Sequence, residues 1–235
     1  MLYNRGVDGL VKEYLVSFYS RSLSLHGDRP EALRWSPEGQ RKRYEVLLEV
    51  GDLRGKKLLD YGCGKGDFYG FLREKGIAAD YTGADINPDL IGLASRKYPD
   101  CKFMVLDIEE KGATSPFDIG AGSPLPKAYR RSGRAAFDYI FLCGVFNQRL
   151  DGVNDTIKNV LSRLWPHARL GLAFNALSSR APRKDTELNY ISPEEFSIFA
   201  RKELTPDVVL RHDYLPEDFT LFLYKNLPSY LTRPP

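Results

Sequence analysis

The sequence has few cysteines and histidines, the residues that build disulfide frameworks and zinc sites. Its three cysteines, Cys63, Cys101 and Cys143, are widely spaced and odd in number, so they predict neither a disulfide framework nor a zinc signature. No set of His, Asp or Glu has the spacing of metal ligands either. We therefore expect no metal site, and reduced thiols of the kind found in cytosolic proteins.

The chain also lacks a long apolar run. No stretch approaches the roughly 20 residues needed to span a bilayer. Residues 1–14 carry charges where a signal peptide would need an apolar core. These absences predict a soluble, cytoplasmic protein without a membrane partner.

No charge of one sign dominates, since 34 basic residues stand against 31 acidic ones and the net charge is +3. Recognition of nucleic acid needs basic residues that cluster on one surface. The nearest cluster lies within residues 127–134, in a Gly/Pro/Ser-rich stretch typical of a solvated loop. The composition disfavours nucleic acid as a partner without excluding it.

What is present suits an α/β domain. Hydrophobic residues make up 43% of the 235 residues, enough for a sizeable core. We expect a single domain over residues 1–235, with a helical N-terminal extension over 1–50 and a core over 51–235. Within the extension, apolar residues recur at helical spacing over 7–20, and Ser36 followed by Pro37 predicts the start of a second helix.

From residue 57 onward, strand and helix patterns alternate, which predicts a parallel sheet covered by helices on both faces. The last two strands are separated by four residues only, so they must pair antiparallel. The predicted strands cover residues 58–61, 81–85, 102–106, 137–143, 169–174, 208–214 and 219–224.

One stretch, residues 109–135, interrupts this alternation between the third and fourth strands. Loops of that length without secondary structure are uncommon unless they are functional or disordered. A flexible insertion and a mobile lid over the site are both consistent with the sequence.

A glycine-rich turn follows the first strand of the predicted core. Glycines at 62, 64 and 66 give the pattern G-x-G-x-G, and glycine lets a backbone turn sharply and approach a ligand closely. A dinucleotide-binding turn would read G-x-G-x-x-G. Asp60, directly before the turn, would repel a pyrophosphate but suits a ligand with a cationic amino group. An NAD-dependent enzyme is therefore disfavoured.

Two further acids end the next two strands. Asp85 lies at the tip of the second strand, where a carboxylate can accept both hydroxyls of a ribose. Asp107 follows the third strand, where it can accept a hydrogen bond from an adenine amino group. Ligands of such folds bind at the carboxyl edge of the sheet, and all three acids are predicted to lie there.

These motifs resemble those of the class I S-adenosylmethionine-dependent methyltransferases. The resemblance covers roughly residues 55–225 and is carried by LLDYGCGKGDFYGFL, YTGADINPDLIGLASRKYP, FMVLDI and FDYIFLCGVFN. It implies an α/β, Rossmann-like fold with a seven-stranded, mostly parallel sheet. The implied strand order is 3-2-1-4-5-7-6, with strand seven antiparallel and helices on both faces.

The resemblance also implies S-adenosylmethionine as the cofactor and S-adenosylhomocysteine as its product. The glycine turn would surround the methionine part, Asp85 would hold the ribose, and Asp107 with Ile108 would flank the adenine. Cys143 and Gly144 would lie beside the sulfonium. The expected cofactor-binding residues are Asp60, Gly62, Cys63, Gly64, Gly66, Asp85, Ile86, Asp107, Ile108, Cys143, Gly144 and Arg43.

Arg43 belongs to the predicted second helix. A guanidinium fits a carboxylate with two hydrogen bonds, so Arg43, or Gln40 in its place, is a candidate for the methionine carboxylate. The alternative is that both lie on an exposed basic helix face.

No residue is assigned a catalytic role. Methyl transfer from a sulfonium is an in-line displacement, so the enzyme mainly aligns the acceptor and excludes water. A general base is needed only when the acceptor is a poor nucleophile. Asn147, Gln148, Asn175 and Tyr190 are candidates for lining an acceptor pocket, and each is equally consistent with a turn or core position.

The resulting hypothesis is a methyltransferase for a small-molecule acceptor, whose pocket is built by the N-terminal helices, the insertion and the loop after strand five. Two alternatives stay open: a methyltransferase that acts on RNA or protein, and a non-catalytic relative that binds the cofactor. The sequence identifies neither the acceptor, nor the atom methylated, nor the oligomeric state.

Overall fold

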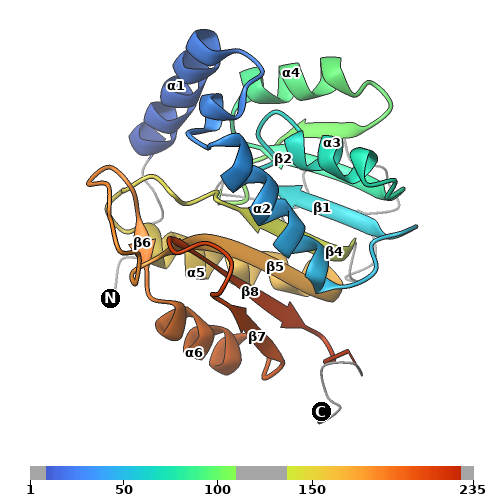
Figure 1. Ribbon diagram of the computed structural model, residues 1–235, viewed down its shortest axis with the longest axis vertical. Helices are drawn as coiled ribbons and strands as arrows, with labels where there is room; N and C mark the ends of the chain where they lie inside the picture. Colours follow the sequence, from blue (N-terminus) through green and yellow to red (C-terminus); the bar gives the residue numbers. More distant parts are fainter. Residues whose placement is uncertain (1–8, 110–136, 229–235) are drawn as a thin grey trace.

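A mixed β-sheet runs through the computed structural model of the protein, which describes residues 9–109 and 137–228 (Figure 1). Its strands are β1 (Lys57–Tyr61), β2 (Asp80–Asp85), β3 (Lys102–Val105), β4 (Phe137–Cys143), β5 (Ala168–Ser178), β6 (Tyr190–Ile191), β7 (Val208–Arg211) and β8 (Asp218–Tyr224). The α-helices are α1 (Gly9–His26), α2 (Pro37–Leu47), α3 (Asp67–Glu74), α4 (Pro88–Lys97), α5 (Val153–Leu164) and α6 (Pro193–Glu203). Short 3₁₀ helices are η1 (Pro30–Leu33), η2 (Leu48–Val50) and η4 (Trp165–His167).

The strand order is β3-β2-β1-β4-β5-β8-β7. It confirms the predicted order 3-2-1-4-5-7-6. When β6, which lies off this path, is left out, β7 and β8 are the sixth and seventh strands in chain order. β8 runs antiparallel to both β5 and β7, as the short connection before it requires. The two-residue β6 pairs with β5 outside the path. It was not predicted, since two residues are too few to show a periodic pattern.

Helices cover both faces of the sheet, which explains why every residue of β4 and of β8 is buried. On one face, Phe68 of α3 packs on Phe141 of β4, and Tyr44 of α2 packs on Phe68. On the other face, Ile157 of α5 and Phe196 of α6 belong to a second cluster of buried hydrophobic residues.

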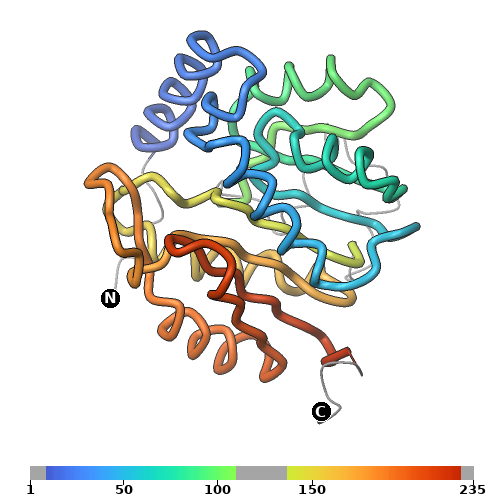
Figure 2. Tube along the Cα trace, in the orientation of Figure 1, coloured from blue at the N-terminus to red at the C-terminus, as the bar shows by residue number. Residues whose placement is uncertain are grey.

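The N-terminal segment packs across the ends of the strands. α1 extends to His26, six residues beyond its predicted end, and lies beside α4 (Figure 2). Asn87 joins the two helices. Its side-chain oxygen caps α4 by accepting from the N–H groups of Asp89 and Leu90, and its Nδ2 donates to the Val16 carbonyl at 2.9 Å.

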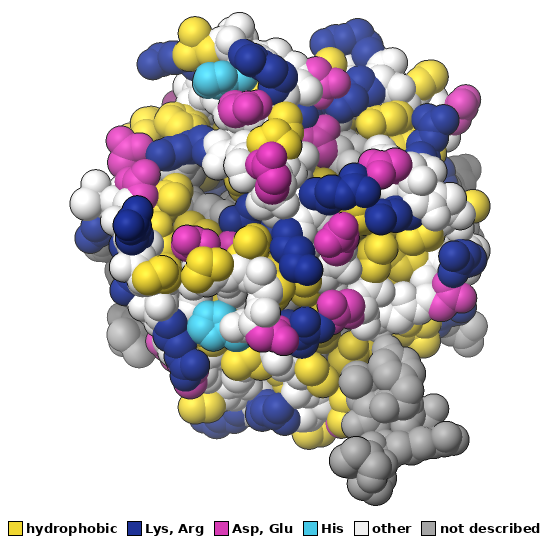
Figure 3. All heavy atoms as spheres, viewed as in Figure 1, with side chains coloured by type: hydrophobic (Ala, Val, Ile, Leu, Met, Phe, Trp, Pro, Cys, Tyr) yellow, Lys and Arg dark blue, Asp and Glu magenta, His cyan; other side chains and the backbone are white. Residues whose placement is uncertain are grey.

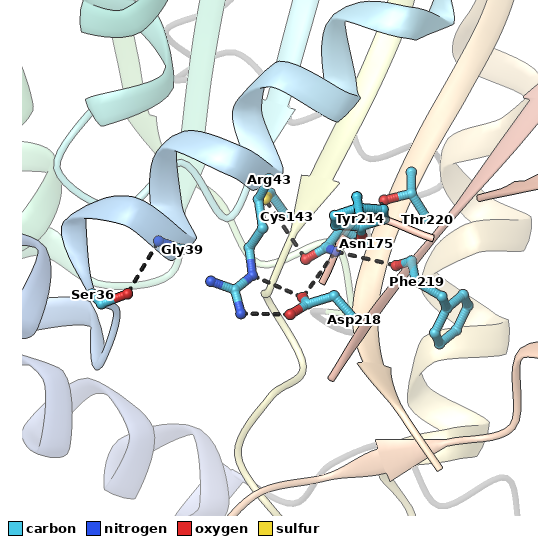
Figure 4. Close-up of polar contacts among 9 residues, drawn as sticks. All are labelled: Ser36, Gly39, Arg43, Cys143, Asn175, Tyr214, Asp218, Phe219 and Thr220. Atoms are coloured by element: carbon cyan, nitrogen blue, oxygen red, sulfur yellow. Dashed lines mark hydrogen bonds and ion pairs between the residues drawn. The ribbon is translucent and has the colours of Figure 1, made fainter. Parts of the chain in front are cut away.

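α2 begins as predicted, because the Ser36 hydroxyl accepts a hydrogen bond from the Gly39 N–H at 3.1 Å. A buried ion pair then fastens this helix to the sheet (Figure 4). Arg43 Nε and Nη2 each donate to Asp218 at 2.7 Å, and the Asp218 side chain is fully buried. Asn175 Nδ2 donates to the same carboxylate at 3.2 Å. The pair therefore joins α2 to β8 and β5.

Residues 110–136 lie outside the described residues, and they contain nearly all of the predicted insertion and the basic cluster. Within the ranges that the structure describes, no helix is both long and apolar enough to cross a membrane. No group of three or more metal-ligating side chains occurs within those same ranges.

Replacing Arg43 by Met is expected to lower the free energy of unfolding by about 3–5 kcal/mol, because the Asp218 carboxylate stays buried without its partner. Arg41 provides the matched control on the same helix. It also donates two hydrogen bonds to one carboxylate, that of Glu74, but both side chains are exposed. Arg41→Met should leave stability almost unchanged. Urea unfolding of the two variants tests this, and equal losses would contradict the importance of burial.

Candidate functional site

A cavity lies at the carboxyl ends of β1, β2 and β4, with α1 and the η1–α2 segment on its other side. It encloses about 1240 Å³ including its open mouth. Nine of the twelve predicted cofactor-binding residues line it, and they come from four separate parts of the chain. These residues are Asp60, Gly62, Cys63, Gly64, Asp85, Ile86, Asp107, Cys143 and Gly144.

The glycine turn is tied to the tip of β2. The N–H groups of Gly62 and Cys63 donate to the Ala84 carbonyl at 2.7 and 3.0 Å. Gly64 has a φ of 54°, in the left-handed region that favours glycine, and its N–H donates to Asp85 Oδ2 at 2.9 Å. The turn and the Asp85 carboxylate therefore hold each other in place.

Backbone donors hold the Asp85 carboxyl group in place. Its Oδ1 accepts from the Asn87 N–H at 2.9 Å. Burial raises the pKa of Asp85, while the hydrogen bonds from Asn87 and Gly64 oppose that shift. The carboxylate is left half-buried at the cavity wall, where it can accept further hydrogen bonds.

Asp60 is the most buried acid of the cavity, with 2% of its surface exposed. Burial, with a smaller contribution from the charges of Asp85 and Asp67, raises its pKa to about 7, although a hydrogen bond from the Tyr81 hydroxyl acts in the opposite direction. Asp60 therefore changes its charge near neutral pH.

The contact of Tyr81 with Asp60 was not predicted from the sequence, although the pairing of β1 with β2 indicates it. Leu58 pairs with Tyr81, and Asp60 pairs with Gly83. Alternate residues of a strand share a face, so Tyr81 and Asp60 point to the same side of the sheet. Because Gly83 has no side chain, the tyrosine ring can reach the carboxyl group diagonally.

Asp107 meets a partner from the N-terminal helix. Lys12 Nζ of α1 lies 2.6 Å from Asp107 Oδ2 and 3.6 Å from Glu109 Oε2. Both Lys12 and Glu109 line the cavity. Nothing in the local sequence around Lys12 indicates this contact, because it depends on the packing of α1 across the strand ends.

The end of β4 forms the opposite wall. Burial raises the pKa of Cys143 well above that of an ordinary thiol, so this residue stays protonated, and its Sγ lies 3.8 Å from Asn175 Oδ1. Gly144 has a φ of 66°. A Cβ there would lie 2.4 Å from the Trp35 ring, so glycine is what allows the indole to close against this wall.

Three predicted residues do not line the cavity. Gly66 is the N-cap of α3 and packs against Phe103, and Ile108 is fully buried in the core. Arg43 is held by Asp218, and the alternative candidate Gln40 donates to Asp67 at 2.9 Å. This placement does not support the predicted role of Arg43 or Gln40 toward a carboxylate, because each is already engaged elsewhere.

Among the candidates for the acceptor pocket, some line the cavity and others are held elsewhere. Asn175 is 1% exposed and donates to the Tyr214 hydroxyl at 2.8 Å and to the Phe219 carbonyl at 3.1 Å (Figure 4). The Tyr190 hydroxyl accepts from a backbone N–H at 2.9 Å. These contacts are structural. Gln148, in contrast, lines the cavity.

Comparison with known proteins agrees with this geometry. A family model described as a methyltransferase domain matches residues 32–205. A methyltransferase-like protein of Mycobacterium tuberculosis is 28% identical over 172 residues, which cover 71% of this chain and 91% of that protein. Trans-aconitate 2-methyltransferase of Escherichia coli strain K12 is 32% identical over 104 residues, covering 44% of this chain and 38% of that enzyme. The match thus spans well under half of the trans-aconitate enzyme.

Two solved structures share the fold at low identity. Magnesium protoporphyrin IX methyltransferase of Synechocystis PCC 6803, with bound S-adenosylmethionine, has a TM-score of 0.60 at 15% identity, covering 94% of this chain and 99% of that one. The 1,6-didemethyltoxoflavin-N1-methyltransferase of Burkholderia thailandensis has a TM-score of 0.58 at 16% identity, covering 93% and 88%. Because the family model spans most of the chain and the sheet has the expected order, this protein belongs to the class I S-adenosylmethionine-dependent methyltransferases.

Proposed function

We propose that this enzyme transfers the methyl group of S-adenosylmethionine to a small-molecule acceptor in the cavity. The observation that carries the proposal is the convergence of Asp60, Asp85 and Asp107 on one cavity together with the glycine turn. A site formed by three strand ends and a glycine turn is where α/β folds of this kind bind ligands.

The chemistry of the lining fits this cofactor. Four carboxyl groups and one lysine, Lys12, are the charged groups of the described lining, so its net charge is negative. S-adenosylmethionine carries a cationic sulfonium and a cationic ammonium group, and it supplies the electrophilic methyl group. Asp85 would hold the ribose hydroxyls, Asp60 the ammonium group, and Asp107 the adenine amino group.

The protein's own contribution is alignment and exclusion of water. Trp35 packs against Gly144 at the end of β4, and Tyr19 and Leu33 line the same side of the cavity. These apolar groups come from the N-terminal segment, which lies over the strand ends. Holding the two reactants in line in a dry site lowers the barrier of a displacement reaction without a catalytic side chain.

A small acceptor is supported by the surface and by the relatives. Basic and acidic side chains are interspersed on the face seen in Figure 3, which lacks the clustered basic surface that RNA binding requires. The names of the related enzymes specify trans-aconitate, 1,6-didemethyltoxoflavin and a magnesium porphyrin, all of them small molecules.

Isothermal titration calorimetry tests the cofactor assignment. We expect micromolar binding of S-adenosylmethionine and S-adenosylhomocysteine and no binding of NAD. Asp85→Ala should weaken the binding of both by about 1–3 kcal/mol, because hydrogen bonds to a charged group are lost. Asp89→Ala, which removes an exposed acid in the first turn of α4, should have no effect. Tight NAD binding, or unchanged affinity in Asp85→Ala, would refute the assignment.

The affinity should also depend on pH through Asp60. Below its pKa of about 7 the carboxyl is neutral, and above it the carboxylate attracts the ammonium group of the cofactor. Affinity for S-adenosylhomocysteine should therefore rise, by up to about tenfold, between about pH 6 and about pH 8. Titrations at the two pH values measure this, and Asp60→Asn should abolish the difference. A fall in affinity with rising pH would rule out this role.

A further inference from the structure

The cavity has two chemically different sides. The carboxyl groups lie at the ends of β1, β2 and β3. The other side is formed by the residues after β4 and by the N-terminal segment. Apart from Lys12, which pairs with Asp107, its lining residues are uncharged and mostly apolar or aromatic. They include Tyr19, Leu33, Trp35, Phe146 and Gln148.

Gln148 has an unused hydrogen-bond donor on this uncharged side. Its residue surface is 8% exposed. Its amide lies near the Tyr19 hydroxyl, since burial raises the pKa of Tyr19 and the Gln148 amide partly opposes that shift. Among the described residues, its Nε2 has no hydrogen-bond partner. A buried amide donor without a partner is costly, and native proteins rarely keep one unless something else completes it.

The backbone holds this amide in position. The Arg149 N–H donates to the Glu187 carbonyl at 2.9 Å, and the Asn189 N–H donates to the Asn147 carbonyl at 2.8 Å. Figure 2 shows the segment after β4 running beside the loop that contains these partners. Backbone hydrogen bonds of the two neighbouring residues therefore hold the segment that contains Gln148, whose side chain lines the cavity.

Trp35 provides a flat wall on the same side. Its ring packs against Gly144, the Arg43 guanidinium lies 5.1 Å from the ring centroid, and the Tyr44 ring lies at 6.0 Å. These neighbours keep the indole in one orientation. Because the Arg43 guanidinium lies over one face of the indole, a planar ligand can stack only on the part of the ring that lines the cavity.

No unpaired cation is available on the described lining for a carboxylate-bearing acceptor. Lys12 is engaged by Asp107 and Glu109. Arg43 and Arg34, which flank the N-terminal wall, are tied to acidic partners and do not line the cavity. The negative net charge of the lining would also repel a polyanion.

We propose that Gln148 and Trp35 form the subsite for the methyl acceptor, and that this acceptor is an uncharged, planar aromatic molecule with a carbonyl oxygen. The oxygen accepts a hydrogen bond from Gln148 Nε2 while the ring stacks on Trp35. The inference rests on the proposed function, since it places the acceptor beside the cofactor. It differs in substrate class from the aliphatic tricarboxylate named for the trans-aconitate enzymes.

Calorimetry on the protein saturated with S-adenosylhomocysteine tests the class of acceptor. The probes are isoquinolin-1-one, isoquinoline, which lacks the carbonyl, and trans-aconitate. We expect isoquinolin-1-one to bind at least about tenfold more tightly than isoquinoline, because only the former satisfies the buried amide. Trans-aconitate should bind more weakly than isoquinolin-1-one.

A variant pair tests the residue. Gln148→Met removes the amide while keeping a side chain of similar length, and it should weaken isoquinolin-1-one at least about tenfold. The same variant should change the affinity for S-adenosylhomocysteine by less than about twofold. Arg149→Met, at the adjacent exposed position, should alter neither affinity. Thermal unfolding of each variant confirms that it is folded.

The outcomes separate the two proposals. If Gln148→Met weakens S-adenosylhomocysteine as much as isoquinolin-1-one, the amide belongs to the cofactor site and the inference is wrong. Tighter binding of trans-aconitate, or no binding of isoquinolin-1-one, overturns the acceptor class while the methyltransferase assignment stands. Failure of the wild-type protein to bind S-adenosylhomocysteine contradicts the proposed function, and this inference with it.

Discussion

The site depends on the hydrogen bonds that join the glycine turn after β1 to the tip of β2. The Ala84 carbonyl accepts from Gly62 and Cys63, and the Gly64 N–H donates to Asp85. These bonds satisfy backbone groups that the end of a strand would otherwise leave unpaired. They also set the position of the Asp85 carboxylate, which we propose holds the ribose, so these bonds fix both the shape of the turn and the group beside it.

The N-terminal segment completes the cavity and is held from two sides. Asn87 joins α1 to α4, and the buried pair of Arg43 and Asp218 joins α2 to β8. Trp35 lies on the connection between these anchors and closes against Gly144. Both anchors are buried, so the N-terminal wall of the cavity is attached to α4 and to the sheet.

Much of the site was predictable, because its signals are local in the sequence. The glycine spacing and the acids at the strand ends indicated the cofactor, and Asp60, Asp85 and Asp107 all line the cavity. Apart from Gly66, the predictions that the placement does not support concern side chains whose direction depends on distant partners. Arg43 turns to Asp218, 175 residues away in the chain, and Ile108 enters the core instead of the cavity.

The sequence by itself determined the alternation of strands and helices, the antiparallel last pair and the class of the cofactor. Hydrophobic periodicity and turn residues act over a few positions, so they can be read directly from the chain. Only the tertiary structure decided which side chains meet across elements. It paired Tyr81 with Asp60 and Lys12 with Asp107, and it left the amide of Gln148 facing the cavity. Such contacts arise from packing between segments far apart in sequence, which no local pattern records.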